Sequence, residues 1–235
     1  MGRVPLIVAP GVWQVDMLAA NAFYVEDVEG GITLVDTGSD PGAKRIALGL
    51  RALGRTPEEL RGVVVTHLHH DHTGGLATVK ARTGAEVWMH AADAAAVRQG
   101  VRVRPLEPGP GVLRAAAVRA IALRPERTGE PVEVEHEVAD GETLPFAGLL
   151  AVHTPGHTAG HLSLLLPRAG GVLFVGDAAT NVGRLAAAPI YEDVAEGRRS
   201  LNKLAALDFE VACFAHGRTI GEGAAERFNA RFGDA

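Results

Sequence analysis

The first 36 residues contain short apolar runs that are interrupted every few positions by glycine, proline or polar residues. Short runs rich in Val, Ile and Leu that end at turn-forming residues are typical of β-strands. A Gly30-Gly31 pair separates the last two runs and predicts a turn. We therefore expect an N-terminal meander with strands over residues 6–8, 12–15, 22–28 and 32–35.

The apolar positions change to a helical spacing after residue 40. Ile46, Leu50 and Leu53 recur three or four residues apart between a proline and a glycine, which predicts an amphipathic helix. Residues 56–59 read TPEE, a capping-box pattern that predicts another helix start. Further strands are expected over residues 63–66, 86–89, 149–154, 162–166, 172–175 and 211–215, and further helices over 76–82, 91–98, 194–206 and 223–231. Strand-then-helix units of this kind predict an α/β architecture.

Residues 66–75 read THLHHDHTGG and follow a β-branched run at 63–65. They place four candidate ligands in the spacing H-x-H-x-D-H, namely His67, His69, Asp71 and His72. Imidazole nitrogens and carboxylate oxygens are ligands of zinc and related cations, and a strand end delivers them to the edge of a sheet. The alternative, a polar loop that happens to be rich in histidine, leaves this spacing unexplained. The cluster predicts a metal site without determining the number of ions.

Three later segments place further candidate ligands at the ends of apolar strands. They are HTPGHTAGH at 153–161, VGDA at 175–178 and FAHG at 214–217. A single histidine near a strand has other common roles, so each segment alone is weak evidence. Their combination with the histidine cluster favours a larger metal centre.

The composition favours a folded globular chain. With 235 residues, 47% of them apolar and 22% charged, the chain can bury a full core as one domain over residues 1–235 or as two duplicated half-domains. Residues 30–37 and 170–177 both combine a Gly-Gly turn, an apolar strand and an aspartate. This similarity favours two related halves, and a generic turn-strand pattern is the alternative.

Charge and targeting features narrow the partners and the location. The net charge of −5 disfavours a nucleic acid as the main partner. Cys213 is the only cysteine, so no intramolecular disulfide can form, and we expect a buried core position for it. No apolar run reaches 18 residues and no leader pattern is visible at the N-terminus. We therefore expect a cytoplasmic protein with no membrane contact.

Residues 98–127 contain seven arginines and two glutamates, whereas residues 130–142 are mainly acidic where charged. The two stretches together define a candidate lid or insertion over residues 98–142. Either the charges are solvated or paired with one another, or an arginine of this segment binds an anionic group of the substrate.

These motifs resemble those of the metallo-β-lactamase superfamily, in the hydrolase branch typified by glyoxalase II and related lactonases. The resemblance extends from LVDTG at 34–38 to AHG at 215–217, and five motifs of the family occur in order. It implies an α/β fold of the αββα type, in which two mixed β-sheets face each other with helices outside. That arrangement agrees with the strands and helices expected from the apolar pattern.

The resemblance implies two divalent metal ions, with Zn²⁺ expected and Fe²⁺ or Mn²⁺ as alternatives. The ligands of the first ion would be His67, His69 and His157. The ligands of the second would be Asp71, His72 and His216. Asp177 would bridge the two ions, and Asp36 would support the site from outside, with a simple turn-forming role as the alternative for Asp36.

The implied reaction is hydrolysis of an ester, thioester or lactone of a small molecule by a hydroxide that bridges the ions. Asp71 and Asp177 would orient the hydroxide, and Asp71 would take up its proton. No G-x-S-x-G, Walker A or G-x-G-x-x-G motif offers a competing nucleophile or nucleotide site. If the arginine-rich segment contacts the substrate, we expect that substrate to be anionic. The oligomeric state stays open between a monomer and a homodimer.

Two other functions share this set of motifs. A persulfide dioxygenase would use one ferrous ion on His67, His157 and Asp177. A non-catalytic protein would bind metal without turnover. Because every implied ligand of a second ion is present, the dinuclear hydrolase is favoured over both.

Departures from individual subfamilies narrow the substrate. Asp177 disfavours β-lactams, because superfamily members that cleave them generally lack the bridging aspartate. Glutathione thioesters are not expected, because only 19 residues follow His216 where glyoxalase II carries a helical domain. Quorum-quenching lactonases place a tyrosine just after the bridging aspartate, whereas here the nearest one is Tyr191.

The remaining histidines are expected outside the ligand set. His161 is a candidate for a hydrogen bond to a ligand or to the substrate, and His70 is expected to point away as a spacer. Structural or exposed positions are expected for His90, His136 and His153.

Overall fold

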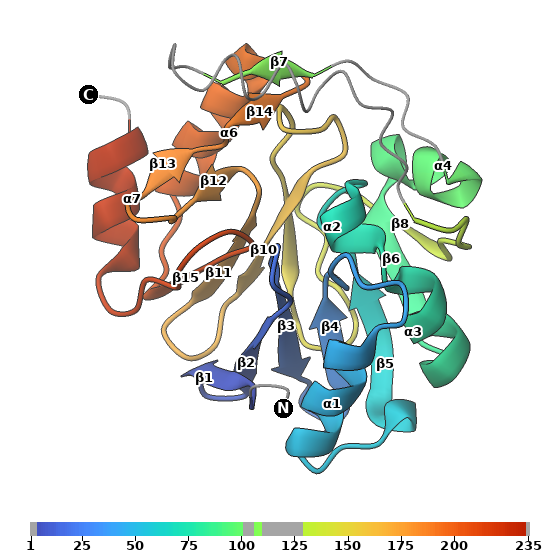
Figure 1. Cartoon of the computed structure of the whole chain (residues 1–235). Helices are drawn as coiled ribbons and strands as arrows, with labels where there is room; N and C mark the ends of the chain where they lie inside the picture. The colour runs from blue at the N-terminus through green and yellow to red at the C-terminus, as the bar shows by residue number, and fades with distance from the viewer. Residues whose placement is uncertain (1–3, 101–105, 110–128, 234–235) are drawn as a thin grey trace.

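In the computed structural model, two β-sheets face each other and helices cover their outer sides (Figure 1). The structure describes residues 4–100, 106–109 and 129–233. The first sheet has the strand order β1-β2-β3-β4-β5-β6-β8. Its strands are β1 (Leu6–Ala9), β2 (Val12–Asp16), β3 (Asn21–Glu26), β4 (Ile32–Val35), β5 (Leu60–Val64), β6 (Glu86–His90) and β8 (His136–Val138). Strands β1 to β4 are antiparallel and β4 to β8 are parallel, so the sheet is mixed.

The second sheet has the strand order β15-β11-β10-β9 and is also mixed. Its strands are β9 (Leu150–His153), β10 (Leu162–Leu166), β11 (Val172–Gly176) and β15 (Val211–Phe214). Strands β9, β10 and β11 are antiparallel, whereas β11 and β15 are parallel. Two short pairs lie beyond it, β12 (Ala179–Thr180) with β13 (Ala186–Ala187) and β7 (Glu107–Pro108) with β14 (Ile190–Tyr191).

The helices divide between the two outer faces. On the side of the first sheet lie α1 (Lys44–Ala52), α3 (Leu76–Thr83) and α4 (Ala91–Gln99), and on the side of the second lie α6 (Val194–Ala205) and α7 (Ala224–Phe232) (Figure 1). The one-turn helix α2 (His70–Thr73) lies at the end of β5 (Figure 1). The predicted αββα sandwich is therefore confirmed.

The alternation of side chains along the strands builds the layers of the core. Val63 and Val65 pack under the helices of the first sheet, whereas Val64 packs between the two sheets. The rings of Phe23 and Phe174 meet edge to face across the sheets, with centroids 5.3 Å apart. Cys213 lies fully buried in the same layer, as predicted. This packing holds the ends of both sheets in fixed relative positions.

The structure corrects one expected helix. Residues 56–59 form only the single turn Pro57–Glu59, because Leu60 immediately begins strand β5. The Thr56 N–H still donates to Glu59 Oε2 at 2.7 Å, so the capping contact forms without a helix behind it. The local pattern predicted the contact, whereas pairing within the sheet made the next residues a strand.

The two similar segments of the sequence become equivalent strands. Each of β4 and β11 has an antiparallel neighbour, β3 or β10, on one side and a parallel neighbour, β5 or β15, on the other. Asp36 and Asp177 follow them at the same edge of the sandwich. The assignment of residues 1–235 to one domain, rather than to duplicated halves, stays a prediction.

The arginine-rich segment lies mostly outside the described residues, including Arg114 and Arg119. Arg98 is described, and its Nη1 donates to Glu137 Oε1 at 2.6 Å, a pairing of the basic and acidic stretches. The role of residues 98–142 as a lid stays a prediction. Among the described helices, none has the length and apolar character needed to cross a membrane.

Candidate metal centre

Polar side chains from both sheets gather at the edge of the sandwich where the strands end. Strand β5 leads into the histidine cluster, β9 into the loop at 154–161, β11 into Asp177 and β15 into His216. Open α/β sheets commonly place their sites at such carboxyl ends. The seven predicted ligands come together in three overlapping groups, within each of which the ligand atoms lie within 4.8 Å of one another. These groups are His67, His69 and His157; His67, His72 and Asp177; and Asp71, His72 and His216.

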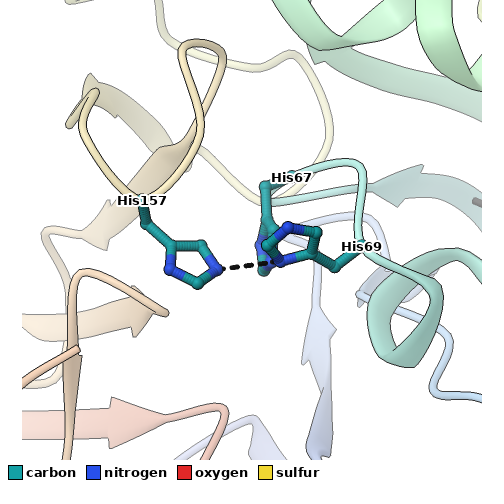
Figure 2. A group of neighbouring side chains, drawn as sticks. All are labelled: His67, His69 and His157. Carbon is teal, nitrogen blue, oxygen red and sulfur yellow. Dashed lines mark hydrogen bonds between the residues drawn. The ribbon is translucent and has the colours of Figure 1, made fainter. Parts of the chain in front are cut away.

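The first group consists of three buried imidazoles whose nitrogens converge (Figure 2). His69 Nδ1 lies 3.0 Å from His67 Nε2 and 2.9 Å from His157 Nε2. His157 Nδ1 donates to the carbonyl oxygen of Ile190 at 2.9 Å, which leaves a lone pair on His157 Nε2. Three nitrogens at this spacing can share one cation.

Burial keeps these three rings neutral. It is the largest cause that lowers the pKa of His67 and His69 well below the ordinary value, and the neighbouring histidines lower both further. Burial also lowers the pKa of His157, although the carboxylate of Asp177 opposes that shift. Neutral imidazoles are the form that binds metal ions, so the group is ready to bind one without losing ring protons to solvent.

The other two sets share His72, and we treat His72, His216, Asp71 and Asp177 together as a second group of two histidines and two carboxylates. His216 Nε2 lies 3.3 Å from Asp71 Oδ2 and 3.2 Å from Asp177 Oδ2. His72 Nε2 lies 3.5 Å from Asp177 Oδ1 and 3.8 Å from Asp71 Oδ2. Asp177 raises the pKa of His216 to about 11. Burial lowers the pKa of His72, but the carboxylates around it, Asp36 above all, outweigh burial and raise this pKa to about 9. Protons and metal ions therefore compete for the same two nitrogens.

Asp177 touches both groups. Besides its contacts to His72 and His216, its Oδ2 lies 3.5 Å from His157 Nε2. Asp177 Oδ1 and His72 Nε2 are buried and have no hydrogen-bond partner among the described residues. Buried polar atoms without a partner cost free energy that a bound cation removes. The donor set and these two atoms fit divalent metal ions.

Asp36 orients the second group from behind. Its Oδ2 accepts from His72 Nδ1 at 2.8 Å, and its Oδ1 accepts from the Thr66 N–H at 2.8 Å. The other nitrogen of His72 is thereby turned toward Asp71 and Asp177. Asp36 has a φ of 61°, a left-handed conformation that lets the chain turn at the end of β4, so it also takes the turn-forming role that was the alternative.

His161 is a positioning group, not a ligand of these groups. Its Nε2 accepts the Asp177 backbone N–H at 2.8 Å, and its Nδ1 contacts Thr154 Oγ1 at 2.8 Å. Burial lowers the pKa of His161 to about 3, so the ring is neutral and one nitrogen is free to accept. The sequence predicted that His161 is a candidate for a hydrogen bond to a metal ligand or to the substrate. In the structure His161 accepts a hydrogen bond from the backbone of Asp177, a predicted metal ligand.

The other histidines lie outside the three groups. His90 and His153 stack on each other with ring centroids 3.9 Å apart, and His136 Nε2 contacts Glu86 Oε2 at 2.9 Å. His70 belongs to none of the three groups, and it borders two cavities, one beside Asp71 and one beside Gly74.

A cavity of about 510 Å³ opens onto the metal groups. One wall carries histidine and aspartate side chains: His69, His70, Asp71, Asp177 and His216. The rest of the lining comes from the segment after β11 and forms a mainly apolar wall: Ala179, Thr180, Val182, Ala188, Pro189 and Ile190. Tyr191 is buried and lines a different cavity with Arg198 and Leu201, so it does not take the place of the lactonase tyrosine.

A family model described as the metallo-beta-lactamase superfamily matches residues 15–216. The chain belongs to this superfamily. Among relatives, a hydroxyacylglutathione hydrolase of Pseudomonas aeruginosa is 32% identical over 201 residues, which are 83% of this chain and 61% of the relative. Another, from Shewanella pealeana, is 31% identical over 77% of this chain and 55% of the relative. An uncharacterized protein of Bacillus subtilis, YobT, is 31% identical over 71% of this chain and 66% of its own length.

The chain spans less than two thirds of the length of these curated relatives. Solved structures of the superfamily match more completely. A metallo-β-lactamase of Cronobacter sakazakii superposes with a TM-score of 0.72 at 26% identity, covering 92% of this chain and 78% of that one. A β-lactamase of Chitinophaga pinensis shares the fold with a TM-score of 0.70 at 22% identity, covering 92% and 78%.

The sequence carried no signal for one buried polar residue at this edge. Asp93 lies in the alanine-rich helix α4, where an acidic side chain in the first turn is ordinarily a solvated partner of the helix dipole. Its carboxylate instead accepts hydrogen bonds from two loops of the metal centre. The partners of Asp93 lie 25 to 67 residues away in the sequence, so no local sequence pattern could predict these hydrogen bonds.

Proposed function

We propose that this chain is a metal-dependent hydrolase that uses two divalent metal ions, with zinc as the expected metal. The observation that carries the proposal is the pair of ligand groups joined by Asp177, which contacts His157 on one side and His72 and His216 on the other. An imidazole-rich set with carboxylates suits zinc, and membership of the superfamily supports the same chemistry.

Two sets of side chains would hold the ions. The first is His67, His69 and His157, and the second is Asp71, His72 and His216. Asp177 would contribute to both, since its Oδ2 lies 3.5 Å from His157 Nε2 of the first set and 3.2 Å from His216 Nε2 of the second. When bound, divalent ions at these positions lower the pKa of water toward neutrality and polarise the oxygen of the electrophile.

The carboxylates supply the proton chemistry. Although burial opposes it, His72 and His216 hold the pKa of Asp71 well below its usual range, so Asp71 is charged. Asp71 is partly exposed and lines the cavity, so it can take the proton of an attacking water and pass it to solvent. Asp177 is more deeply buried, and its backbone is held by His161, which suits an orienting role.

The cavity favours the acyl part of a small ester, thioester or lactone as the group that is bound. Its apolar wall from Ala179 to Ile190 can cover aliphatic carbons, while the reacting carbonyl faces the metal groups. The hydroxyacylglutathione hydrolases among the relatives are named for hydrolysis of an acylated glutathione, which supports the acyl class. We further propose that the substrate is anionic and that the arginine-rich segment binds its charged group.

Metal content and a substrate panel test this function. We expect zinc-, manganese- or iron-reconstituted protein to bind two ions per chain and to hydrolyse lactones or thioesters faster than phosphodiesters and β-lactams. One iron per chain together with oxygen uptake on glutathione persulfide would instead identify a dioxygenase. Full metal loading without turnover of any ester would identify a non-catalytic metal-binding protein.

A further inference from the structure

Asp93 is a buried carboxylate that lies outside the ligand groups. It occupies the first turn of α4 and its side chain has 0% exposure. Its Oδ2 accepts from the Leu68 backbone N–H at 3.2 Å and from Thr158 Oγ1 at 2.6 Å. Its Oδ1 accepts from the Gly160 backbone N–H at 2.9 Å. None of these three donors belongs to α4, so the carboxylate joins the helix to two separate loops.

Those two loops carry all three imidazoles of the first ligand group. Leu68 lies between His67 and His69 in one loop, and Thr158 follows His157 in the other. The nitrogens that approach each other, His69 Nδ1 and His157 Nε2, lie 2.9 Å apart across the gap between the loops. A single carboxylate oxygen, Asp93 Oδ2, accepts from both sides of that gap.

The close approach to Asp93 is built into the second loop. A Cβ atom at Gly160 would lie 2.6 Å from Asp93 Cγ and 2.7 Å from Asp93 Cβ, closer than any side chain tolerates. Burial of a carboxylate is costly unless hydrogen bonds compensate it, and here three donors do so. Burial, together with the neighbouring carboxylate of Glu192, raises the pKa of Asp93 to about 6, although the hydrogen bonds from Thr158, Leu68 and Gly160 oppose the shift. Without the carboxylate the buried N–H groups of Leu68 and Gly160 would lose their acceptor, so Asp93 ties both loops to α4.

We infer that Asp93 is a positioning residue for the first metal ion, because its carboxylate sets the distance between the loop of His67 and His69 and the loop of His157. The inference rests on the proposed function, in which these three histidines bind a metal ion. Metal–ligand distances in proteins are held to about 0.2 Å, so loosening either loop weakens the whole group. Partners that orient metal ligands typically contribute about 10–100-fold to metal affinity.

The test isolates the first ion and measures its affinity directly. In a His216→Ala background, which disables the second group, Zn²⁺ affinity is measured by competition with a chromophoric chelator, with and without Asp93→Asn. We expect Asp93→Asn to raise the Kd about 10–100-fold. Cobalt substitution provides a second readout, because the visible absorption of Co²⁺ reports its ligand geometry, and we expect its intensity to change.

Asp27→Asn is the matched control. Asp27 is also a buried carboxylate that accepts backbone N–H groups, from Gly31 at 2.8 Å and Glu29 at 2.9 Å, but it lies in the turn before β4. The same change of charge there should leave the Zn²⁺ affinity and the Co²⁺ spectrum unchanged. An Asp93→Asn chain that matches Asp27→Asn in both readouts would overturn the inference.

Thr158→Val keeps the test valid if Asp93→Asn folds poorly. It removes only the 2.6 Å hydrogen bond and preserves the shape of the side chain, so a smaller rise in Kd is expected. The two changes should combine with less than additive effect, because they break the same interaction. In chains with His216 intact, Asp93→Asn should weaken mainly the binding of the first ion. If it lowered the affinity for both ions equally, the cause would be general destabilisation and the inference would be overturned. Absence of Zn²⁺ binding by His216→Ala with Asp93 intact would instead reject the proposed function.

Discussion

The Nε2 atom of His161 accepts the backbone N–H of Asp177 at 2.8 Å. A chain of buried hydroxyl groups fixes the tautomer that makes this possible. Ser163 Oγ donates to the Val175 carbonyl at 3.0 Å, so it accepts from Thr154 Oγ1 at 3.1 Å, and Thr154 in turn accepts from His161 Nδ1. The carboxylate that contacts both ligand groups is therefore held through its own backbone, and its side chain is left for metal ions.

Replacement of His161 by Phe should reduce hydrolysis although no predicted ligand changes. The ring volume is kept, but the Asp177 N–H loses its acceptor, so the carboxylate shifts relative to both ligand groups. We expect kcat to fall about 10–100-fold, the range found when a partner that orients a ligand is lost. His136→Gln is the control, because His136 contacts Glu86 on the surface and should give normal kinetics. Equal kcat in the two variants would contradict the positioning role.

Replacement of Asp177 by Ala tests the bridging position itself. The change removes a side chain that contacts both ligand groups, so metal content should fall below two ions per chain. Hydrolysis should fall at least about 100-fold, as when a preorganised electrostatic group is removed. Elemental analysis and kcat/KM measure the two effects. The surface variant Asp140→Ala, which breaks a contact to Lys203, should change neither. Activity near wild type in Asp177→Ala would reject the dinuclear assignment.

The parts of the fold and site with local patterns could be predicted from the sequence. The β-branched run at 63–65 predicted a strand, and the H-x-H-x-D-H spacing predicted that its end delivers metal ligands. His157, Asp177 and His216 also follow strands, but each was weak evidence alone, and the family resemblance assigned them as ligands. The layers of the sandwich followed from the resemblance, because apolar alternation alone does not say which sheet a strand joins.

The parts that could not be predicted depend on contacts between distant residues. Asp93 is 65 residues from Thr158, and nothing in the sequence AADAAA distinguishes a buried carboxylate from a solvated one. At 56–59 the helix-start pattern was correct locally, but pairing of β5 with β4 determined the chain path.

Asp36 should make the stability of the metal-free chain depend on pH. Burial lowers the pKa of His72, but Asp36, Asp71 and Asp177 outweigh it and raise the pKa to about 9. Because the folded value lies above the unfolded value of about 6.5, this stabilisation is complete below that pH and is lost as the pH rises through 9. In chelator-treated protein we expect Tm to fall by at least about 2 °C between pH 7 and 9.5.

Asp36→Asn should make this fall smaller, because the neutral amide no longer favours the charged ring of His72, whereas the part of the fall due to His216, whose pKa Asp177 raises to about 11, remains. Zinc-loaded wild type should lack the fall, since a bound metal ion keeps the proton off His72 Nε2. Thermal unfolding at a series of pH values distinguishes the three samples. A metal-free wild-type profile that is flat above pH 7, or one that Asp36→Asn leaves unchanged, would show that Asp36 does not set the protonation of His72.

The apolar wall of the cavity should determine the preferred acyl length. Val182 lines this wall and is 68% exposed, so Val182→Asp changes the cavity without disturbing the core. Each buried methylene contributes about 0.8 kcal/mol, so KM for a hexanoyl ester should rise several-fold more than KM for the acetyl ester of the same alcohol. The control is Val28→Asp, at an exposed position in the turn between β3 and β4, which should leave both values unchanged. If Val182→Asp raises KM equally for short and long acyl groups, the wall does not bind the acyl chain, and the preference for acyl substrates must come from the metal groups alone.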